Sequence, residues 1–298
     1  MKPFQHILCP TDFSPSSRHA QDLALTLAND FQARLTLFHS VDSPVYSSWP
    51  TVPQPEFAAE RQRWAKKEMA ALEASLASPR VGAKLGEGPP HQAIAREAAR
   101  DGVDLVVMGT HGLSGFEKLF LGSTTEKVLH LVETPLLTVN PSSRKPEPSA
   151  GKGKAFRNIV LAADFGPGTV ATAEYALLMG RQYRSRITAV HAHPRPLEMS
   201  HELAASWFQA VELDRAAATL KLRKLIPPSV REVCETDFVA REGEPFEIIR
   251  QVAQEVEADL VVMGAHGTGK SGLAWLGSTA HKMIRAAQCP VLVVRRSA

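Results

Sequence analysis

Short strand-like segments and longer amphipathic segments alternate along the first half of the chain. The strand-like segments lie at 7–9, 34–41, 81–85, 105–108 and 136–139. The segments between them have apolar residues at helical spacing, and they cover 15–31, 56–77, 91–100 and 123–132. This βαβαβαβαβ order predicts a parallel sheet with helices on both faces, joined by right-handed crossovers.

The second half of the chain repeats this pattern. Residues 158–165 match residues 6–13, and residues 259–267 match residues 104–112. The offset between the copies grows by three residues from the first pair of blocks to the second, so a net insertion lies between them. A repeat of this length indicates two whole domains rather than a short-period solenoid.

We therefore predict two tandem α/β domains, each a doubly wound fold, over 1–140 and 156–298. The segment between them, 141–155, is rich in proline, serine, glycine and charge, which is typical of a linker.

Composition narrows the class of protein. With 298 residues, 44% of them hydrophobic, the chain can bury two cores. The formal net charge of +3 is small, and part of the basic excess lies in the linker, so nucleic-acid binding is not indicated. The cysteines Cys9, Cys234 and Cys289 lack metal-ligand spacing and are expected to be reduced, mostly buried thiols. Neither a signal-peptide pattern nor a membrane-length apolar run is visible, so we expect a soluble, cytoplasmic protein without membrane partners.

The candidate ligand site lies at the carboxyl ends of the strands. In an open parallel sheet a ligand binds where the chain reverses its direction across the sheet, which here selects the loops after the first and fourth strands. The first loop carries Asp12 or Asp164, and the second begins at Gly109 or Gly264. Glycine lets backbone N–H groups approach a phosphate closely, and the start of the next helix favours an anion.

A glycine spacing, GxxG, nine residues and then GS, occurs at this point in both halves, beginning at Gly109 and at Gly264. It resembles the ATP-binding signature of the universal stress protein family, and the aspartate after the first strand recurs with it. The resemblance covers nearly all of both halves. It implies a five-stranded sheet of order 3-2-1-4-5 in each.

The resemblance also implies which residues bind ATP, or ADP or AMP, with Mg present only alongside the nucleotide. In that family the first loop and the end of the second strand hold adenine and ribose, and the glycine loop with its serine holds the phosphates. The residues implied for the first site are Pro10, Thr11, Asp12, Val41, Met108, Gly109, Gly112, Gly122, Ser123 and Thr124. Those for the second site are Ala162, Ala163, Asp164, Met263, Gly264, Gly267, Lys270, Gly277, Ser278 and Thr279. His193 stands in place of Val41 there, which departs from the usual small apolar residue.

Several of these residues also have structural interpretations. Ser123 and Glu126 have the spacing of a capping box, which would account for the serine without a ligand. Asp12 could help to start a helix at Ser14, although its recurrence as Asp164 favours a ligand contact. The histidines at strand ends and in the glycine loops fit structural or solvated roles as well as catalytic ones. They are His39, His111, His191 and His266.

Residues 264–271 also satisfy the phosphate-loop pattern GxxxxGK[ST]. A true phosphate loop runs directly into a long helix, whereas Gly272 follows here, and the matching first-half segment 109–116 has no lysine. We interpret the match as accidental.

Three functions remain open from the residues. The first, which we favour, is a non-catalytic module whose ATP occupancy changes its partner or oligomer. The second is an ATPase or phosphotransferase using the same sites, although no positioned base is evident. The third is a ligand-free interaction scaffold. The resemblance further implies pairing of the final strands, so that 136–139 and 291–294 would form an internal pseudo-dimer, with a homodimer as a further step.

Overall fold

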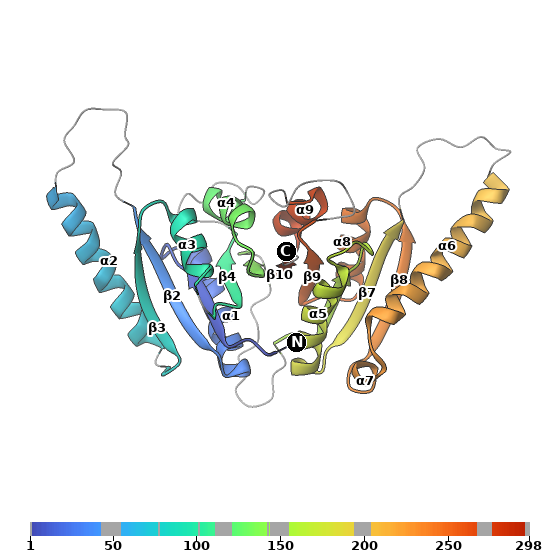
Figure 1. Ribbon diagram of the computed structural model, residues 1–298, viewed down its shortest axis with the longest axis horizontal. Coiled ribbons are helices and arrows are strands. Elements are labelled where there is room, and N and C mark those ends of the chain that lie inside the picture. Colours follow the sequence, from blue (N-terminus) through green and yellow to red (C-terminus); the bar gives the residue numbers. More distant parts are fainter. Residues whose placement is uncertain are drawn as a thin grey trace. The chain divides into compact units, whose positions relative to one another are not determined.

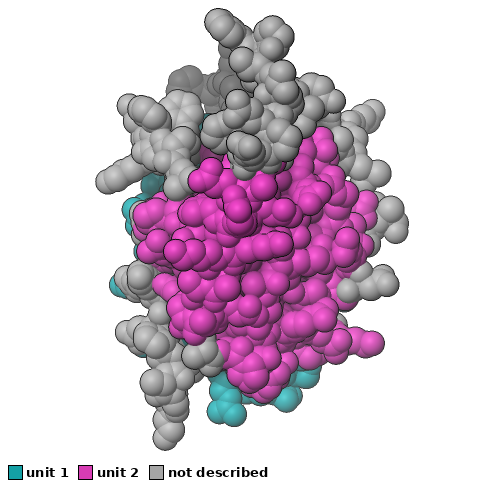
Figure 2. All heavy atoms as spheres, turned by 90° about the vertical axis from the view of Figure 1, so that its left-hand side faces the viewer, with its two compact units in different colours: residues 1, 142–298 teal, residues 2–141 magenta. Residues whose placement is uncertain are grey.

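The computed structural model describes residues 2–42, 55–76, 78–100, 102–110, 121–141, 143, 155–193, 204–266 and 276–295. The chain divides into two compact units, Lys2–Pro141 and Ser142–Ala298, coloured magenta and teal in Figure 2. We call them the N-terminal unit and the C-terminal unit.

The N-terminal unit is a five-stranded parallel sheet with the strand order β3-β2-β1-β4-β5 (Figure 1). The fold class and strand order predicted from the sequence are confirmed. Its elements are β1 His6–Pro10, α1 Pro15–Phe31, β2 Arg34–Val41, α2 Pro55–Leu76, β3 Val81–Glu87, α3 Pro90–Ala98, β4 Leu105–Gly109, α4 Ser123–Leu131 and β5 Leu136–Val139.

The C-terminal unit repeats this arrangement with the order β8-β7-β6-β9-β10. Its elements are β6 Asn158–Ala162, α5 Thr169–Tyr183, β7 Arg186–His193, α6 Ala204–Leu225, α7 Pro228–Arg231, β8 Thr236–Glu242, α8 Pro245–Glu255, β9 Leu260–Gly264, α9 Ser278–Ala286 and β10 Val291–Val294. Among the described residues of the N-terminal unit, the short helix α7 has no counterpart. It lies between the second and third strands of its unit, within the longer stretch between matched blocks where the sequence predicts a net insertion.

Several strands are buried along their whole length, which accounts for their continuous apolar sequence. Every residue of β1, β4 and β5 is buried, as is every residue of β10. Right-handed crossovers place α1 and α2 on one face of the N-terminal sheet and α3 and α4 on the other. Helix α1 packs on β1 and β4, whereas α3 packs on β2 and β3. The chain therefore reverses its direction across the sheet between β1 and β4.

An aspartate joins the start of the first strand to the fourth strand in both units. The carboxylate of Asp104 accepts hydrogen bonds from the backbone N–H of Gln5 at 2.8 Å and of His6 at 3.3 Å. Asp259 does the same for Arg157 at 2.8 Å and Asn158 at 3.0 Å. Hydrogen bonds to a charged acceptor contribute about 1.5–3 kcal/mol each, so these contacts help to fix the central pairing.

The three cysteines are buried and form no disulfide. Burial raises the pKa of Cys9 to about 12 and that of Cys289 to about 12, which keeps both thiols protonated and unreactive near neutral pH. None of the helices in the described segments combines the length and hydropathy that crossing a bilayer requires.

Candidate functional site

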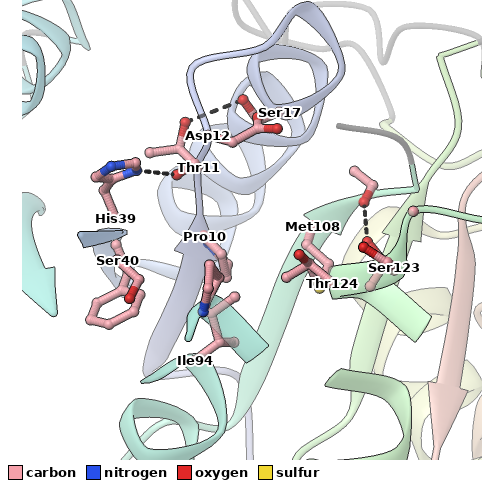
Figure 3. A pocket seen from close by; sticks show the side chains of 15 residues that line it. Pro10, Thr11, Asp12, Ser17, His39, Ser40, Ile94, Met108, Ser123 and Thr124 are labelled. Carbon is pink, nitrogen blue, oxygen red and sulfur yellow. Dashed lines mark hydrogen bonds between the residues drawn. The ribbon is translucent and has the colours of Figure 1, made fainter. Parts of the chain in front are cut away.

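A cavity of about 350 Å³ lies at the carboxyl ends of β1, β2 and β4 in the N-terminal unit (Figure 3). Its volume is within the range of small-molecule sites, about 300–1,000 Å³. Its lining residues are Pro10, Thr11, Asp12, Ser17, Phe38, His39, Ser40, Pro90, Ile94, Met108, Gly109, Gly122, Ser123, Thr124 and Thr125.

Most of the residues assigned to the first site from the sequence line this cavity. Two do not. Val41 is not among the lining residues, and the end of β2 contributes His39 and Ser40 instead. Gly112 lies outside the described residues. Pro90 and Ile94 of α3 also line the cavity but were not predicted from the sequence. Their spacing does not indicate that the start of α3 lies beside the carboxyl ends of the strands.

The loop after β1 is held in one conformation by hydrogen bonds. Thr11 donates its N–H to the Phe38 carbonyl at 2.8 Å, and its hydroxyl accepts from the Gln21 amide at 2.7 Å. Phe13 then adopts a left-handed backbone conformation with φ 64°, which turns the chain toward α1. Asp12 is therefore presented from a fixed turn rather than from a free loop.

A histidine from the second strand anchors this loop in both units. His39 Nδ1 lies 2.8 Å from the Thr11 carbonyl oxygen, and His191 Nδ1 lies 2.7 Å from that of Ala163. Because a carbonyl only accepts, each Nδ1 carries the proton. Each imidazole also lies against the left-handed phenylalanine that follows, with centroid distances of 4.7 Å to Phe13 and 4.3 Å to Phe165. The structural interpretation of these histidines therefore accounts for their positions.

Helix α1 is capped by Ser14, and Asp12 binds the backbone N–H of this N-cap residue. The Ser14 hydroxyl accepts from the N–H of Ser17 at 3.1 Å, and Asp12 Oδ1 accepts from the N–H of Ser14 at 3.0 Å. In the C-terminal unit the Oδ1 of Asp164 accepts from the Gly166 N–H at 2.9 Å and from the Thr169 hydroxyl at 2.8 Å. The two aspartates occupy equivalent places with different local partners.

Helix α4 begins without a side-chain cap. Its N-cap is Gly122, and Ser123 is the first helical residue. A capping box needs the serine at the N-cap, so the interpretation of Ser123 and Glu126 as a capping box is wrong. Helix α9 begins in the same way after Gly277. Within the described part of the chain, no side chain caps the first-turn N–H groups of either helix, which lie at the positive end of the helix dipole.

Two hydrogen bonds bring the start of α4 back to the end of β4. Gly122 donates its N–H to the Thr110 carbonyl at 2.7 Å, and the Thr125 hydroxyl donates to the Gly109 carbonyl at 2.9 Å. Gly277 and Ala265 repeat the first of these at 2.7 Å in the C-terminal unit. Asp12 and the α4 residues Ser123 and Thr124 consequently line one cavity, as Figure 3 shows.

Gly109 is required by close packing rather than by its backbone angles. A Cβ at this position would lie 2.6 Å from Ser16 Oγ and 3.0 Å from the Ser16 carbonyl oxygen. The start of α1 can therefore approach β4 only because residue 109 has no side chain. The equivalent Gly264 is less crowded, with its nearest neighbours at 3.3 Å and 3.5 Å.

The C-terminal unit places most of its assigned residues at the corresponding strand and helix ends. These are Ala162, Ala163, Asp164, Met263, Gly264, Gly277, Ser278 and Thr279. Gly267 and Lys270, and with them most of the 264–271 phosphate-loop match, lie outside the described residues.

At the end of its second strand, the C-terminal unit has the imidazole of His193 where the N-terminal unit has the apolar side chain of Val41. Its Nδ1 lies 3.1 Å from Asp214 Oδ2 of α6, and its ring packs edge-on against His191 at 4.7 Å. Burial lowers the pKa of His191, the Ala163 hydrogen bond opposes this, and His193 lowers it further. The carboxylates of Asp214 and Asp164 also raise it.

No group of three or more His, Cys, Asp or Glu side chains suited to a metal ion occurs among the described residues. The described part of the cavity lining therefore holds backbone N–H groups, hydroxyls and one carboxylate rather than a metal-ligand set.

The fold and site define a tandem α/β protein with one doubly wound unit per repeat. Residues 3–140 and 155–295 both match the universal stress protein family. The chain belongs to this family.

Relatives resemble either one unit or the whole chain. A universal stress protein of Thermus aquaticus is 35% identical over 141 residues, which are 47% of this chain and 99% of that protein. One of Mycolicibacterium smegmatis is 24% identical over 298 residues, covering 97% of this chain and 96% of its own. The crystal structure of a universal stress protein from Archaeoglobus fulgidus has a TM-score of 0.68 at 19% identity and covers 98% of both chains. This last likeness concerns the fold.

We predict that Gly109→Ala destabilises the N-terminal unit by about 1–3 kcal/mol, because the added methyl group overlaps Ser16. The matched variant Gly264→Ala is expected to cost about 1 kcal/mol or less. Hydrogen exchange of strand amides in each unit measures both changes. Equal costs in the two units would contradict the packing explanation.

We also predict that the C-terminal unit loses stability as the pH falls below about 6.5. The fold holds the pKa of His191 below its ordinary value, so the unfolded chain binds the proton more tightly. His191→Asn keeps a donor for the Ala163 carbonyl but does not titrate. Urea unfolding at about pH 8 and about pH 5.5 should show a smaller acid-induced loss in this variant. An unchanged loss would exclude His191 as its source.

Proposed function

We propose that the N-terminal unit binds an adenine nucleotide in the cavity between β1, β2 and β4, as a cytoplasmic regulatory protein of the universal stress type. The observation that supports this proposal most is the N-terminus of α4, which has no side-chain cap among the described residues. Its first turn lines the same cavity as Asp12.

The phosphates belong at the start of α4. Uncapped N–H groups and the helix dipole, equivalent to roughly half a positive charge, favour an anion there. The hydroxyls of Ser123 and Thr124 also line the cavity, and within the described part of the chain they have no hydrogen-bond partner. They can therefore donate to phosphate oxygens without breaking a contact to any of the described residues.

The nucleoside belongs at the β1 and β2 side of the cavity. Ile94, Met108 and Phe38 supply apolar surface for a base, and Asp12 supplies a carboxylate that can accept from ribose hydroxyls. Adenine rather than another base is favoured by membership of the family, whose ATP-binding signature the glycine spacing resembles. Mg²⁺ would enter with the polyphosphate.

We propose a binding role rather than catalysis. Among the described lining residues the ionisable groups are Asp12 and His39, and the Nδ1 proton of His39 is already donated to Thr11. Slow hydrolysis on the ordered phosphates is the alternative, and it would use the same residues.

We predict that Asp12→Asn weakens ATP binding about tenfold or more. The amide can still accept from the Ser14 N–H, but it loses the charge that strengthens a bond to a ribose hydroxyl. Isothermal titration with ATP and Mg²⁺ gives the affinity. Chromatography of nucleotides released by heating shows what the purified protein already carries.

Asp164→Asn is the matched control, because Asp164 holds the equivalent place with local partners of its own. It is expected to leave the affinity of the first site unchanged. A wild-type protein that neither carries nor acquires nucleotide would support the scaffold function instead. A ratio of ADP to ATP that rises with time only in the wild type would establish hydrolysis.

A further inference from the structure

A second cavity, also of about 350 Å³, lies at the opposite end of the N-terminal sheet. It is formed where β1, β2 and β3 begin and α3 ends, the elements at the blue to blue-green end of Figure 1. Its lining includes three cationic side chains, Arg34, Lys84 and Arg100, and one carboxylate, Glu97. His6, Thr36 and Gly82 also line it.

A buried histidine orients two of the lining groups. Arg34 Nη2 lies 2.9 Å from His6 Nδ1, and His6 Nε2 lies 2.8 Å from the Thr36 hydroxyl. Arginine only donates, so His6 accepts at Nδ1, carries its proton on Nε2 and donates that proton to Thr36. The hydroxyl proton of Thr36 is thereby left to donate to another acceptor.

The cavity carries more positive than negative charge. Glu97 is 6% exposed, and its two oxygens are bound by Lys84 at 2.6 Å and by Arg100 at 3.2 Å. Glu97 thus offsets part of the charge of those two cations. Arg34 forms no ion pair with any of the residues that the structure describes.

In the C-terminal unit, the arginine equivalent to Arg34 forms an ion pair with a carboxylate of the same unit. Arg186 begins β7 as Arg34 begins β2, and its Nε lies 2.6 Å from Oδ2 of Asp237 on β8. The residue equivalent to Asp237 in β3 is Gly82. A Cβ at Gly82 would meet no heavy atom within 4 Å.

The fold does not require this cluster. Counterparts of Lys84 and Glu97 in the C-terminal unit are Val239 and Val252, and the sheet there has the same strand order. The N-terminal unit therefore keeps three cations around an open space at the place where its repeat supplies an internal carboxylate.

We propose that this cavity binds a small oxyanion, a phosphate or carboxylate group, on the guanidinium of Arg34 with the Thr36 hydroxyl as a second donor. The ligand takes the place that Asp237 occupies in the C-terminal unit. A guanidinium pairs with two oxygens of one anion at once, which selects phosphate and carboxylate over chloride. This proposal is independent of nucleotide binding at the carboxyl ends of the strands.

Gly82→Asp tests the proposal by building the internal carboxylate into the N-terminal unit. The new side chain enters open space and is expected to pair with Arg34 as Asp237 pairs with Arg186. Inorganic phosphate, succinate and chloride are titrated into the full-length protein at matched ionic strength. Calorimetric heat and the shift in melting temperature report binding.

The wild type is expected to bind phosphate or succinate, and Gly82→Asp is expected to weaken that binding at least tenfold. Gly82→Ala is the matched control and should bind within twofold of the wild type, because its methyl group meets nothing. Arg34→Gln should reproduce the loss seen in Gly82→Asp without adding a charge. Whether phosphate or succinate binds identifies the class of oxyanion.

Three outcomes would overturn the proposal. One is a wild type that responds equally to chloride, and another is no binding of either oxyanion. The third is equal binding by Gly82→Ala and Gly82→Asp, which would place the anion elsewhere, for instance at the start of α4. The Gly82 variants leave that cavity untouched, so the result does not depend on whether ATP binds.

Discussion

The parallel pairing of β1 with β4 is the constraint on which the site depends. Ile7 lies opposite Leu105 and Leu8 opposite Val106, and the chain leaves β1 toward one edge of the sheet before it continues from β4 toward the other. Helices that connect the strands must then go to opposite faces, and the carboxyl ends of the two strands are left without a covering connection. Gly109 lets the start of α1 approach this point, and α4 begins beside it with its N–H groups uncapped.

The two units act as natural variants of one another. In both units the loop after the first strand is held by a histidine and is followed by a phenylalanine in the left-handed conformation, so this arrangement belongs to the shared backbone structure. The side chains at equivalent positions around this loop differ between the units. Thr11 and its hydroxyl network become Ala163, and Val41 becomes the buried His193, which contacts Asp214. The two sites are therefore expected to differ in their ligand contacts while sharing a backbone.

Periodicity and the internal repeat were sufficient to predict the strands and the helices, because those features depend on which residues must be buried. The strand order came from the resemblance to the universal stress protein family. The change in offset showed only that a net insertion lies between the two pairs of matched blocks, and it did not predict that α7 forms there. The roles of individual side chains at the site were harder to predict from the sequence. Spacing alone suggested that Ser123 was an N-cap, whereas the helix begins one residue earlier than that assignment requires, with Gly122 as its N-cap.

Other features could not be predicted because they depend on contacts between distant segments. Gly109 is needed for its approach to Ser16, almost a hundred residues earlier in the chain. The cluster around Arg34 brings together residues from three strands and a helix, and no single motif marks it. Only comparison of Gly82 with Asp237, once their strands were aligned, shows that one unit lacks a carboxylate which the other has.

The central claim is that a nucleotide spans the loop after β1 and the first turn of α4. Hydrogen–deuterium exchange of the backbone amides at 11–14 and 122–126, with and without ATP and Mg²⁺, tests it most directly. We expect ATP to slow exchange in both segments together, because its nucleoside and its phosphates contact them at the same time. Unchanged exchange at 122–126 in protein saturated with ATP would contradict it, since the phosphates would then lie somewhere other than on the bare start of α4.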